Sequence, residues 1–261
     1  MNTSASSAPA TAAFFDLDRT LIAGSSAFVF GRAARDAGLV RTWDFLEDAL
    51  GAVWFRLAGA SDDVAASARD RMLLAVAGVR HEDLVDLNDM VLPELLGLIR
   101  PEARALLEHH RAAGRETWIV SASPVEIVEP LAHALSMTGG IGTRGEVVDG
   151  ICTGRLDGPF CYGTGKAEAI SRLAYERGID LTNSWGYSDS ASDIPMMEIV
   201  GNAVAVNPDQ RLADTAAERG WPVVEFSRRS RMLVRRYGTL GAFAVGLLAA
   251  WSLGLRKGRQ R

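Results

Sequence analysis

The hydrophobic positions of this 261-residue chain fall into two alternating patterns. Short unbroken apolar runs occur at Phe14-Phe15, Trp118–Val120 and Trp185–Tyr187, and a polar side chain follows each of them closely. Between these runs, apolar residues recur three or four positions apart, which is the period of an amphipathic helix. Short buried strands that alternate with helices predict an α/β fold with a doubly wound, mostly parallel, Rossmann-like sheet.

The stretch 25–97 departs from this alternation, because it contains no convincing strand pattern. Its spacing predicts helices at Phe28–Ala37, Thr42–Leu57, Asp62–Ala77 and His81–Val91. We therefore expect an inserted all-helical cap domain over 25–97. The core would be formed by residues 12–24 and 98–226.

The second part of the core has further recognisable elements. Helices are expected at Pro101–Ala113, Val125–Leu135, Lys166–Arg177 and Asp209–Arg219, and the last two strands at 202–206 and 222–226. Asp149-Gly150 stands between short strand-like runs in Glu146–Leu156, which is a hairpin signal.

Both ends of the chain differ from the core. Residues 1–11 are rich in Ser and Ala and are expected to be a disordered tail without the features of a secretory signal. Within the basic tail 227–261, residues 237–255 carry no charge, and a helix over them would be about 28 Å long, near the thickness of a bilayer's hydrocarbon core. The pattern predicts a cytoplasmic protein with a candidate transmembrane helix that anchors it to the inner face of the cell membrane. The alternative is a C-terminal helix packed on the core or on another subunit.

Composition narrows the classes of function. The 28 Lys and Arg residues against 32 Asp and Glu residues give a formal net charge of −4, which leaves no broad basic field for nucleic acid. A hydrophobic content of 48% suffices for a full core. Cys152 and Cys161 match neither a zinc spacing nor a disulfide framework.

The candidate chemistry starts where the first apolar run ends. Asp16 and Asp18 follow Phe14-Phe15 and are one residue apart, with Thr20 two residues further on. A pair of carboxylates at the end of a strand suits a reaction in which one acid attacks and the other handles a proton, with a hard cation between them. The alternative is a strand followed by an Asp-capped turn.

Three later segments carry polar residues at comparable places. Ser121 ends an apolar strand, Lys166 opens a helix after Gly163-Thr164-Gly165, and Asp189 and Asp193 follow the strand that begins at Trp185. Ligands of open α/β sheets bind outside the carboxyl ends of the strands, so these side chains are expected to meet at one edge.

The order of these residues resembles the motifs of the haloacid dehalogenase (HAD) superfamily, and within it the phosphoserine-phosphatase-like branch (subfamily IB). The resemblance covers roughly residues 12–226. Asp16-Leu17-Asp18-Arg19-Thr20 matches the first motif, Ser121 the second, Lys166 the third, and Asp189 with Asp193 the fourth.

The resemblance implies a phosphatase and assigns a role to each motif residue. Asp16 would be the nucleophile that forms an aspartyl phosphate, and Asp18 the general acid and base. Ser121 and Lys166, with Thr20, would bind the phosphate. The metal implied is Mg²⁺, held by Asp16, the main-chain carbonyl of Asp18 and Asp189, with Asp193 orienting the metal's shell or Lys166 rather than ligating directly.

The substrate depends on the cap, where the sequence departs from phosphoserine phosphatases. Those enzymes typically carry an acidic residue shortly after the first motif, which meets the substrate's ammonium group, and Ser25 stands at that place here. Arg71 matches the family's cap arginine and would clamp a carboxylate or a second phosphate. The alternative for Arg71 is a solvated helix residue.

These features favour a Mg²⁺-dependent phosphatase that hydrolyses a phosphate monoester of a small metabolite or lipid head group. One alternative is phosphoserine phosphatase proper, and another is a phosphotransferase or mutase. From a different class, the chain would be a catalytically silent, membrane-associated regulatory protein that keeps the fold. The intact motif residues speak against this last alternative.

Overall fold

The computed structural model describes residues 9–40 and 62–226. Its main feature is a six-stranded sheet in the order β3-β2-β1-β6-β7-β8, in which every neighbouring pair is parallel. The strands are β1 (Ala12–Phe15), β2 (Glu116–Pro124), β3 (Gly139–Thr143), β6 (Trp185–Ser188), β7 (Asn202–Val206) and β8 (Val223–Val224). The predicted fold class, a doubly wound parallel sheet, is confirmed.

The strand order reverses beside β1. From β1 the chain passes to β2 and then outward to β3, whereas β6 returns to the other side of β1 and β7 and β8 continue outward from there. The crossover connections therefore leave β1 and β6 in opposite directions. A crevice opens at such a switch point, outside the carboxyl ends of the strands, and this is where open α/β sheets bind their ligands.

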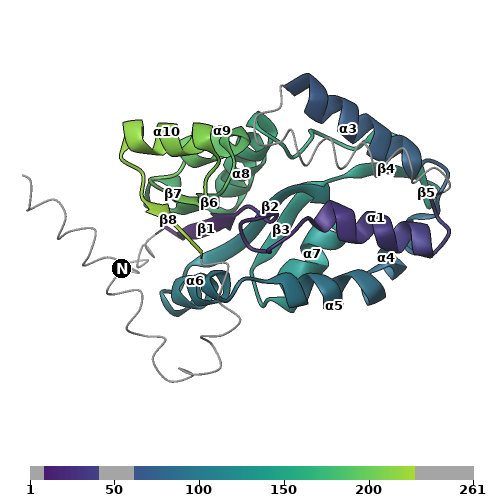
Figure 1. Cartoon of the computed structure of the whole chain (residues 1–261), viewed down its shortest axis with the longest axis horizontal. Helices are drawn as coiled ribbons and strands as arrows, with labels where there is room; N and C mark the ends of the chain where they lie inside the picture. Colours follow the sequence, from purple (N-terminus) through teal and green to yellow (C-terminus); the bar gives the residue numbers. More distant parts are fainter. Residues whose placement is uncertain (1–8, 41–61, 227–261) are drawn as a thin grey trace, which may run out of the picture. The chain divides into compact units, whose positions relative to one another are not determined.

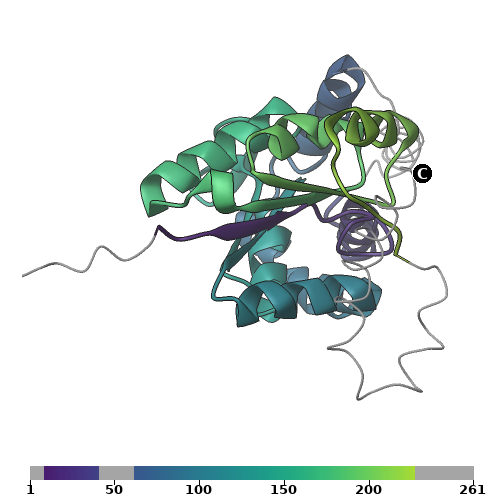
Figure 2. The same ribbon diagram turned by 90° about the vertical axis from the view of Figure 1, so that its left-hand side faces the viewer.

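Helices cover both faces of the sheet (Figures 1 and 2). Figure 2 shows α8, α9 and α10 above the sheet, and α6 and α7 lie on its other face, where they contact β2. These helices are α6 (Pro101–Ala112), α7 (Val125–Ala134), α8 (Thr164–Arg177), α9 (Ile194–Glu198) and α10 (Gln210–Arg219). Because it is covered on both faces, β1 is buried along its whole length and reads as a continuous apolar run.

The helices between β1 and β2 gather beside this core. Those described ahead of α6 are α1 (Ser26–Asp36), α3 (Asp62–Ala75), α4 (His81–Asp86) and α5 (Asn88–Leu98). The predicted hairpin is confirmed as β4 (Gly145–Val148) and β5 (Ile151–Leu156). It packs beside α3, and the loop after α3 bonds to it: Gly78 N donates to the Cys152 carbonyl (2.8 Å), and Cys152 N to the Val79 carbonyl (2.9 Å). A strand pair from the segment after β3 thus lies beside a helix from the segment before β2.

Several elements differ from the sequence-based expectation. The predicted helix His81–Val91 is in fact two helices, because the chain bends at Leu87 and α5 then continues to Leu98. Pro93 lies in the second turn of α5, where it has no N–H to donate to the carbonyl of Asp89. Two short elements, β3 and α9, were not predicted, because the glycines of β3 and the five-residue length of α9 obscure the periodicity of their apolar residues.

Three expectations lie wholly or mostly outside the described residues: the disordered tail 1–11, the helix Thr42–Leu57 and the candidate transmembrane segment 237–255. Among the helices that the structure does describe, none combines the length and the apolar character needed to cross a membrane.

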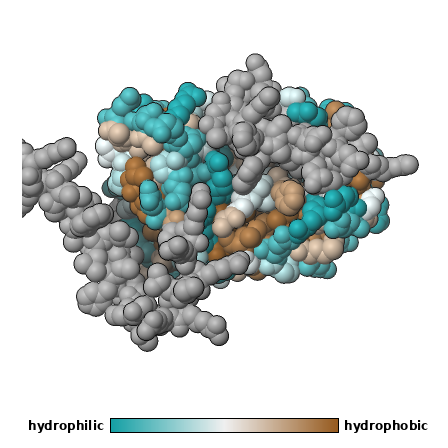
Figure 3. Space-filling model, in the orientation of Figure 1, coloured by the Kyte–Doolittle hydropathy of each residue, from teal (hydrophilic) through white to brown (hydrophobic). Residues whose placement is uncertain are grey.

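On the face seen in Figure 3, hydrophobic residues gather in a band near the middle, between more polar surfaces.

A buried histidine gives this core a predicted pH dependence. His110 on α6 lies with its Nε2 2.9 Å from the Tyr187 hydroxyl, and its ring meets Phe15 edge-on. Burial, reinforced by the nearby Arg115 charge, lowers the pKa of His110 from 6.5 to about 3. The unfolded chain therefore binds this proton more readily, so the stability that His110 contributes is complete above pH 6.5 and is lost as the pH falls toward 3.

We expect His110→Gln to lose less stability than the wild type between pH 7.5 and pH 4.5. The amide can still hydrogen-bond Tyr187 but has no proton to gain. Urea unfolding at several pH values measures the difference, with the exposed His133→Gln as the matched control that should follow the wild type. Equal pH slopes for wild type and His110→Gln would contradict the assignment.

Candidate active site

Two buried carboxylates lie at the switch point of the sheet. Asp16 directly follows β1 and Asp189 directly follows β6, and these strands are neighbours. The pairing of β1 with β6 continues one residue past β1, because Asp16 N donates a hydrogen bond of 2.9 Å to the Tyr187 carbonyl. The exposed fractions of the two residues are only 8% and 4%. The topology thus brings together acids that are 173 positions apart in the sequence.

Lys166 joins this pair from the first turn of α8. Its Nζ donates to Asp16 Oδ1 at 2.6 Å and to Asp193 Oδ2 at 2.8 Å, and its side chain is only 3% exposed. Asp193, in a short 3₁₀ helix (Ala191–Asp193), also accepts from Ser188 Oγ at 2.7 Å. A buried ammonium between two carboxylates is fixed in place, because leaving any one of these charges unpaired is costly.

The backbone before Lys166 explains how α8 reaches the site. A Cβ on Gly165 would lie 2.0 Å from the Phe160 carbonyl oxygen, so a larger residue would displace the start of the helix. The predicted role of Gly163-Thr164-Gly165 as the lead into the Lys166 helix agrees with this close approach.

Asp18 is held by a chain of hydroxyl groups that the sequence pattern does not predict. Its Oδ1 accepts from Ser26 N at 2.8 Å and from Ser26 Oγ at 2.6 Å. Ser26 Oγ in turn lies 2.6 Å from Ser123 Oγ, and Ser123 N donates to Ser121 Oγ at 3.1 Å. These contacts tie the first motif to the end of β2.

Arg19 also lies in the site, although its role was not expected. Its Nε is 2.6 Å from Asp189 Oδ2. Arg19 has a φ of 64°, in the left-handed region that is unusual for a residue with a side chain, and such strain clusters at functional sites. The sharp turn after β1 thus directs a guanidinium toward the second acid.

These side chains line one cleft with about 540 Å³ of empty space, its open mouth included. The cleft is lined by Asp16, Asp18, Arg19, Ser121, Ala122, Tyr162, Lys166, Asp189, Ser190, Ser192 and Asp193. Of the eight residues predicted for the site, six therefore come together here.

The two remaining predicted residues are placed elsewhere. Thr20 is buried, it is not among the residues that line the cleft, and its Oγ1 has no hydrogen-bond partner among the described residues. Arg71 on α3 is exposed, and its Nε donates to the Ser67 carbonyl at 3.3 Å. Phosphate binding by Thr20 and substrate binding by Arg71 stay predictions.

Burial dominates the electrostatics of the cleft. It raises the pKa of Asp16 from 3.8 to about 6, against the opposing effect of Lys166, and it also raises the pKa of Asp18. The pKa of Asp189 lies well above its usual value because of burial and then the Asp16 charge. The pKa of Lys166 is raised by Asp16 and Asp193 despite its burial, so it is a permanent cation.

The donor set fits a divalent metal ion. Four carboxylates (Asp16, Asp18, Asp189, Asp193) face two cations (Lys166, Arg19), which leaves a formal charge of −2 when all are ionised. In addition, Asp193 Oδ1 is buried without a hydrogen-bond partner in the described part of the chain. Within residues 9–40 and 62–226, no three acidic, His or Cys side chains form a ready-made metal cage. Mg²⁺ does not need such a cage, because it keeps several waters.

The fold and the cleft together define a class: a hydrolase with a pair of tandem aspartates, a serine, a lysine and a second acidic pair at the switch point of a parallel sheet. The chain belongs to the haloacid dehalogenase-like hydrolase family, whose model matches residues 13–198. It is an enzyme of the phosphatase type, with phosphoserine-phosphatase-like relatives.

Individual relatives support this placement. The chain is 40% identical over 256 residues to the protein named phosphoserine phosphatase SerB1 of Mycobacterium tuberculosis, covering 95% of this chain and 81% of that protein. A structure of a protein of unknown function from Bordetella pertussis matches with a TM-score of 0.72 at 27% identity, covering 84% of this chain and 100% of the other. A substrate-bound phosphoserine phosphatase structure shares the fold, with a TM-score of 0.62 at 17% identity over 88% of this chain and 99% of that one.

Proposed function

We propose that this protein is a Mg²⁺-dependent phosphatase that hydrolyses phosphate monoesters through an aspartyl-phosphate intermediate on Asp16. The observation that carries the proposal is the contact of Lys166 Nζ with both Asp16 and Asp193 beside a separately held Asp18. Asp16 is thereby oriented, and a second carboxyl is left for proton transfer.

In the first step, Asp16 attacks the phosphorus, the bond to the alcohol oxygen breaks, and the phosphoryl group passes to the carboxylate. The carboxylates of Asp16 and Asp189 and the Asp18 carbonyl would hold the metal, with Asp193 accepting from its water shell or orienting Lys166. Bound there, the cation supplies charge that screens the repulsion between the anionic phosphate and the carboxylate.

Asp18 serves as general acid and then as general base. Its raised pKa favours the protonated form, which can donate to the leaving alkoxide. In the second step, the carboxylate takes a proton from the water that hydrolyses the aspartyl phosphate. Ser26 fixes the orientation of the Asp18 carboxyl through two hydrogen bonds and leaves its other oxygen available.

Lys166 and Ser121 are placed to bind the non-bridging phosphate oxygens. Lys166 is a permanent buried cation, and Ser121 is 3% exposed and lines the same cleft. Such preorganised donors and charges stabilise the charge that develops in the transition state.

The release of inorganic phosphate from p-nitrophenyl phosphate tests this function. We expect steady turnover with Mg²⁺ and its loss when EDTA removes the metal, with recovery when Mg²⁺ is added back. Well-folded protein that hydrolyses no phosphate monoester with Mg²⁺, Mn²⁺ or Co²⁺ would instead favour the catalytically silent alternative.

The membrane association expected from residues 237–255 stays a prediction, as does a lipid head group as the substrate. Phosphoserine, the substrate named for several relatives, is the second candidate. Against it, Ser25 caps α1 at the place where an acid would meet the substrate ammonium, and its Oγ accepts from Phe28 N at 3.4 Å.

A further inference from the structure

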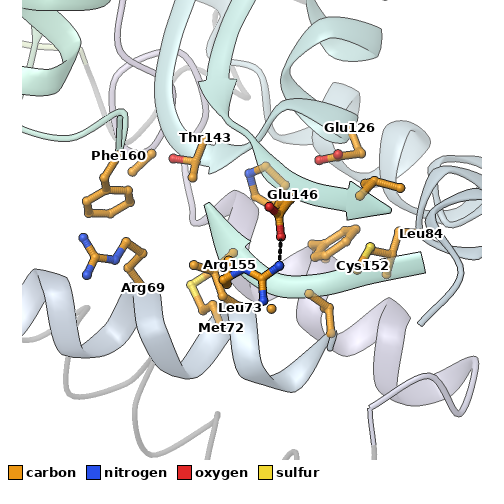
Figure 4. Close-up of a pocket in the computed structure, with 17 residues that line it drawn as sticks. Arg69, Met72, Leu73, Leu84, Glu126, Thr143, Glu146, Cys152, Arg155 and Phe160 are labelled. Atoms are coloured by element: carbon orange, nitrogen blue, oxygen red, sulfur yellow. Dashed lines mark ion pairs between the residues drawn. The ribbon is translucent and has the colours of Figure 1, made fainter. Parts of the chain in front are cut away.

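A second, mainly apolar pocket lies between α3, the β4–β5 hairpin and the end of β2 (Figure 4). It encloses about 700 Å³ of empty space, its open side included. Figure 4 shows Met72 and Leu73 rising from α3, with Arg69 and Phe160 at one end and Leu84 and Cys152 at the other. The apolar wall consists chiefly of Phe30, Met72, Leu73, Val76, Leu84 and Phe160.

This apolar pocket adjoins the catalytic cleft. Ala122, the residue after Ser121, lines both spaces. Phe160 of the pocket stacks on Tyr162 of the cleft, with ring centroids 5.5 Å apart and an angle of 19° between the rings. A molecule whose phosphate lies at Asp16 therefore meets the pocket where its alcohol portion continues.

The charged side chains around the pocket already have partners. Arg155 pairs with Glu146 at 2.5 Å, as the dashed line in Figure 4 marks. Arg69 pairs with Asp70 at 2.7 Å, and Glu126 Oε1 lies 3.1 Å from His81 Nε2. A substrate ammonium or carboxylate would have to compete with these existing pairs, whereas an uncharged apolar group would not.

We propose that this pocket binds the apolar portion of the substrate, so that the preferred substrates are phosphate monoesters of uncharged apolar alcohols rather than amino-acid phosphates. This inference rests on the proposed function, because it concerns the alcohol that the same cleft releases. It assigns the surface formed by α3 and the hairpin the task of selecting that alcohol.

A series of ethyl, butyl, hexyl and octyl phosphate tests the proposal with the full-length enzyme and Mg²⁺. Each methylene that enters the pocket is expected to raise kcat/KM by about fourfold, which corresponds to about 0.8 kcal/mol, until the pocket is full. The charged counterparts, 4-aminobutyl phosphate and phosphoserine, should be poorer substrates than butyl phosphate.

Two nearly isosteric substitutions locate the effect. The double variant Met72→Gln/Val76→Thr makes the wall polar and should lower the ratio of octyl to ethyl phosphate kcat/KM by about tenfold or more. Leu74→Gln is the matched control, since Leu74 is on the same helix but is 68% exposed and lies outside the pocket. Its ratio should equal that of the wild type.

The outcomes separate this inference from the function on which it rests. If no phosphate monoester is hydrolysed, the proposed function fails. If ethyl phosphate is hydrolysed but the rate does not rise with chain length, or phosphoserine is preferred, the pocket proposal is wrong and the function stands. A chain-length dependence that the double variant leaves intact would overturn this pocket as its origin.

Discussion

Replacing Asp16 by Asn is expected to abolish turnover while leaving the fold intact. The amide has nearly the same volume and can still accept from Lys166, but it does not attack phosphorus. A loss of kcat on the order of 10⁴ to 10⁶ is typical when an enzyme loses its nucleophile or the base that activates it. Phosphate release measured with p-nitrophenyl phosphate at saturating Mg²⁺ checks this result.

Stability provides the control for this variant. Burial raises the pKa of Asp16, and Lys166 keeps its ion pair with Asp193 when Asp16 becomes a neutral amide, so the Tm should stay close to that of the wild type. The exposed Asp89→Asn should retain both wild-type activity and Tm. Hydrolysis by Asp16→Asn near the wild-type rate would refute Asp16 as the nucleophile.

Asp18→Asn is expected to lower kcat by roughly 10² to 10⁴, the usual contribution of a general acid–base group. The loss should depend on the substrate. Ethyl phosphate needs a proton on its leaving alkoxide and should suffer in both steps, whereas p-nitrophenyl phosphate releases a stable phenolate and should suffer mainly in the second. Steady-state kinetics with both substrates measure the difference.

Ser26→Ala is the milder companion of this variant. It removes one of the two hydrogen bonds that orient Asp18 and should reduce kcat by less than Asp18→Asn, with KM little changed. An equal loss of kcat/KM, which reports the first step, with both substrates in Asp18→Asn would mean that Asp18 acts in something other than leaving-group protonation.

The sequence predicts much of this fold because its central strands are buried on both faces. A strand such as β1 then reads as an unbroken apolar run, and the carboxylates that end β1 and β6 stand out against it. In contrast, β3 contains three glycines in five residues, and its close packing against α7 leaves no room for the side chains that would reveal a strand. The local pattern of apolar residues does not reveal a strand such as β3, because contacts with residues elsewhere in the fold require its glycines.

The same distinction applies to the candidate site. Asp16 and Asp189 were predictable because each follows a strand, and Lys166 because it lies in the first turn of a helix. Ser121 stood out at the end of an apolar run, but it does not end its strand as predicted, because β2 continues to Pro124. Ser26 and Arg19 were not predictable, since their roles depend on a turn that brings one to Asp18 and directs the other to Asp189. The direction of the Arg19 side chain depends on its positive φ, and a sequence motif gives no backbone dihedral angles.

The most direct test of the central claim is to trap the phosphoryl group on the enzyme. Asp18→Asn, mixed with p-nitrophenyl phosphate and Mg²⁺ and quenched in acid, should carry one phosphoryl group on the peptide that contains Asp16, and hydroxylamine should remove it as expected for an acyl phosphate. Two results would contradict the account: a wild-type enzyme that is active while neither protein carries a label at residue 16, or a hydroxylamine-resistant label on Ser121.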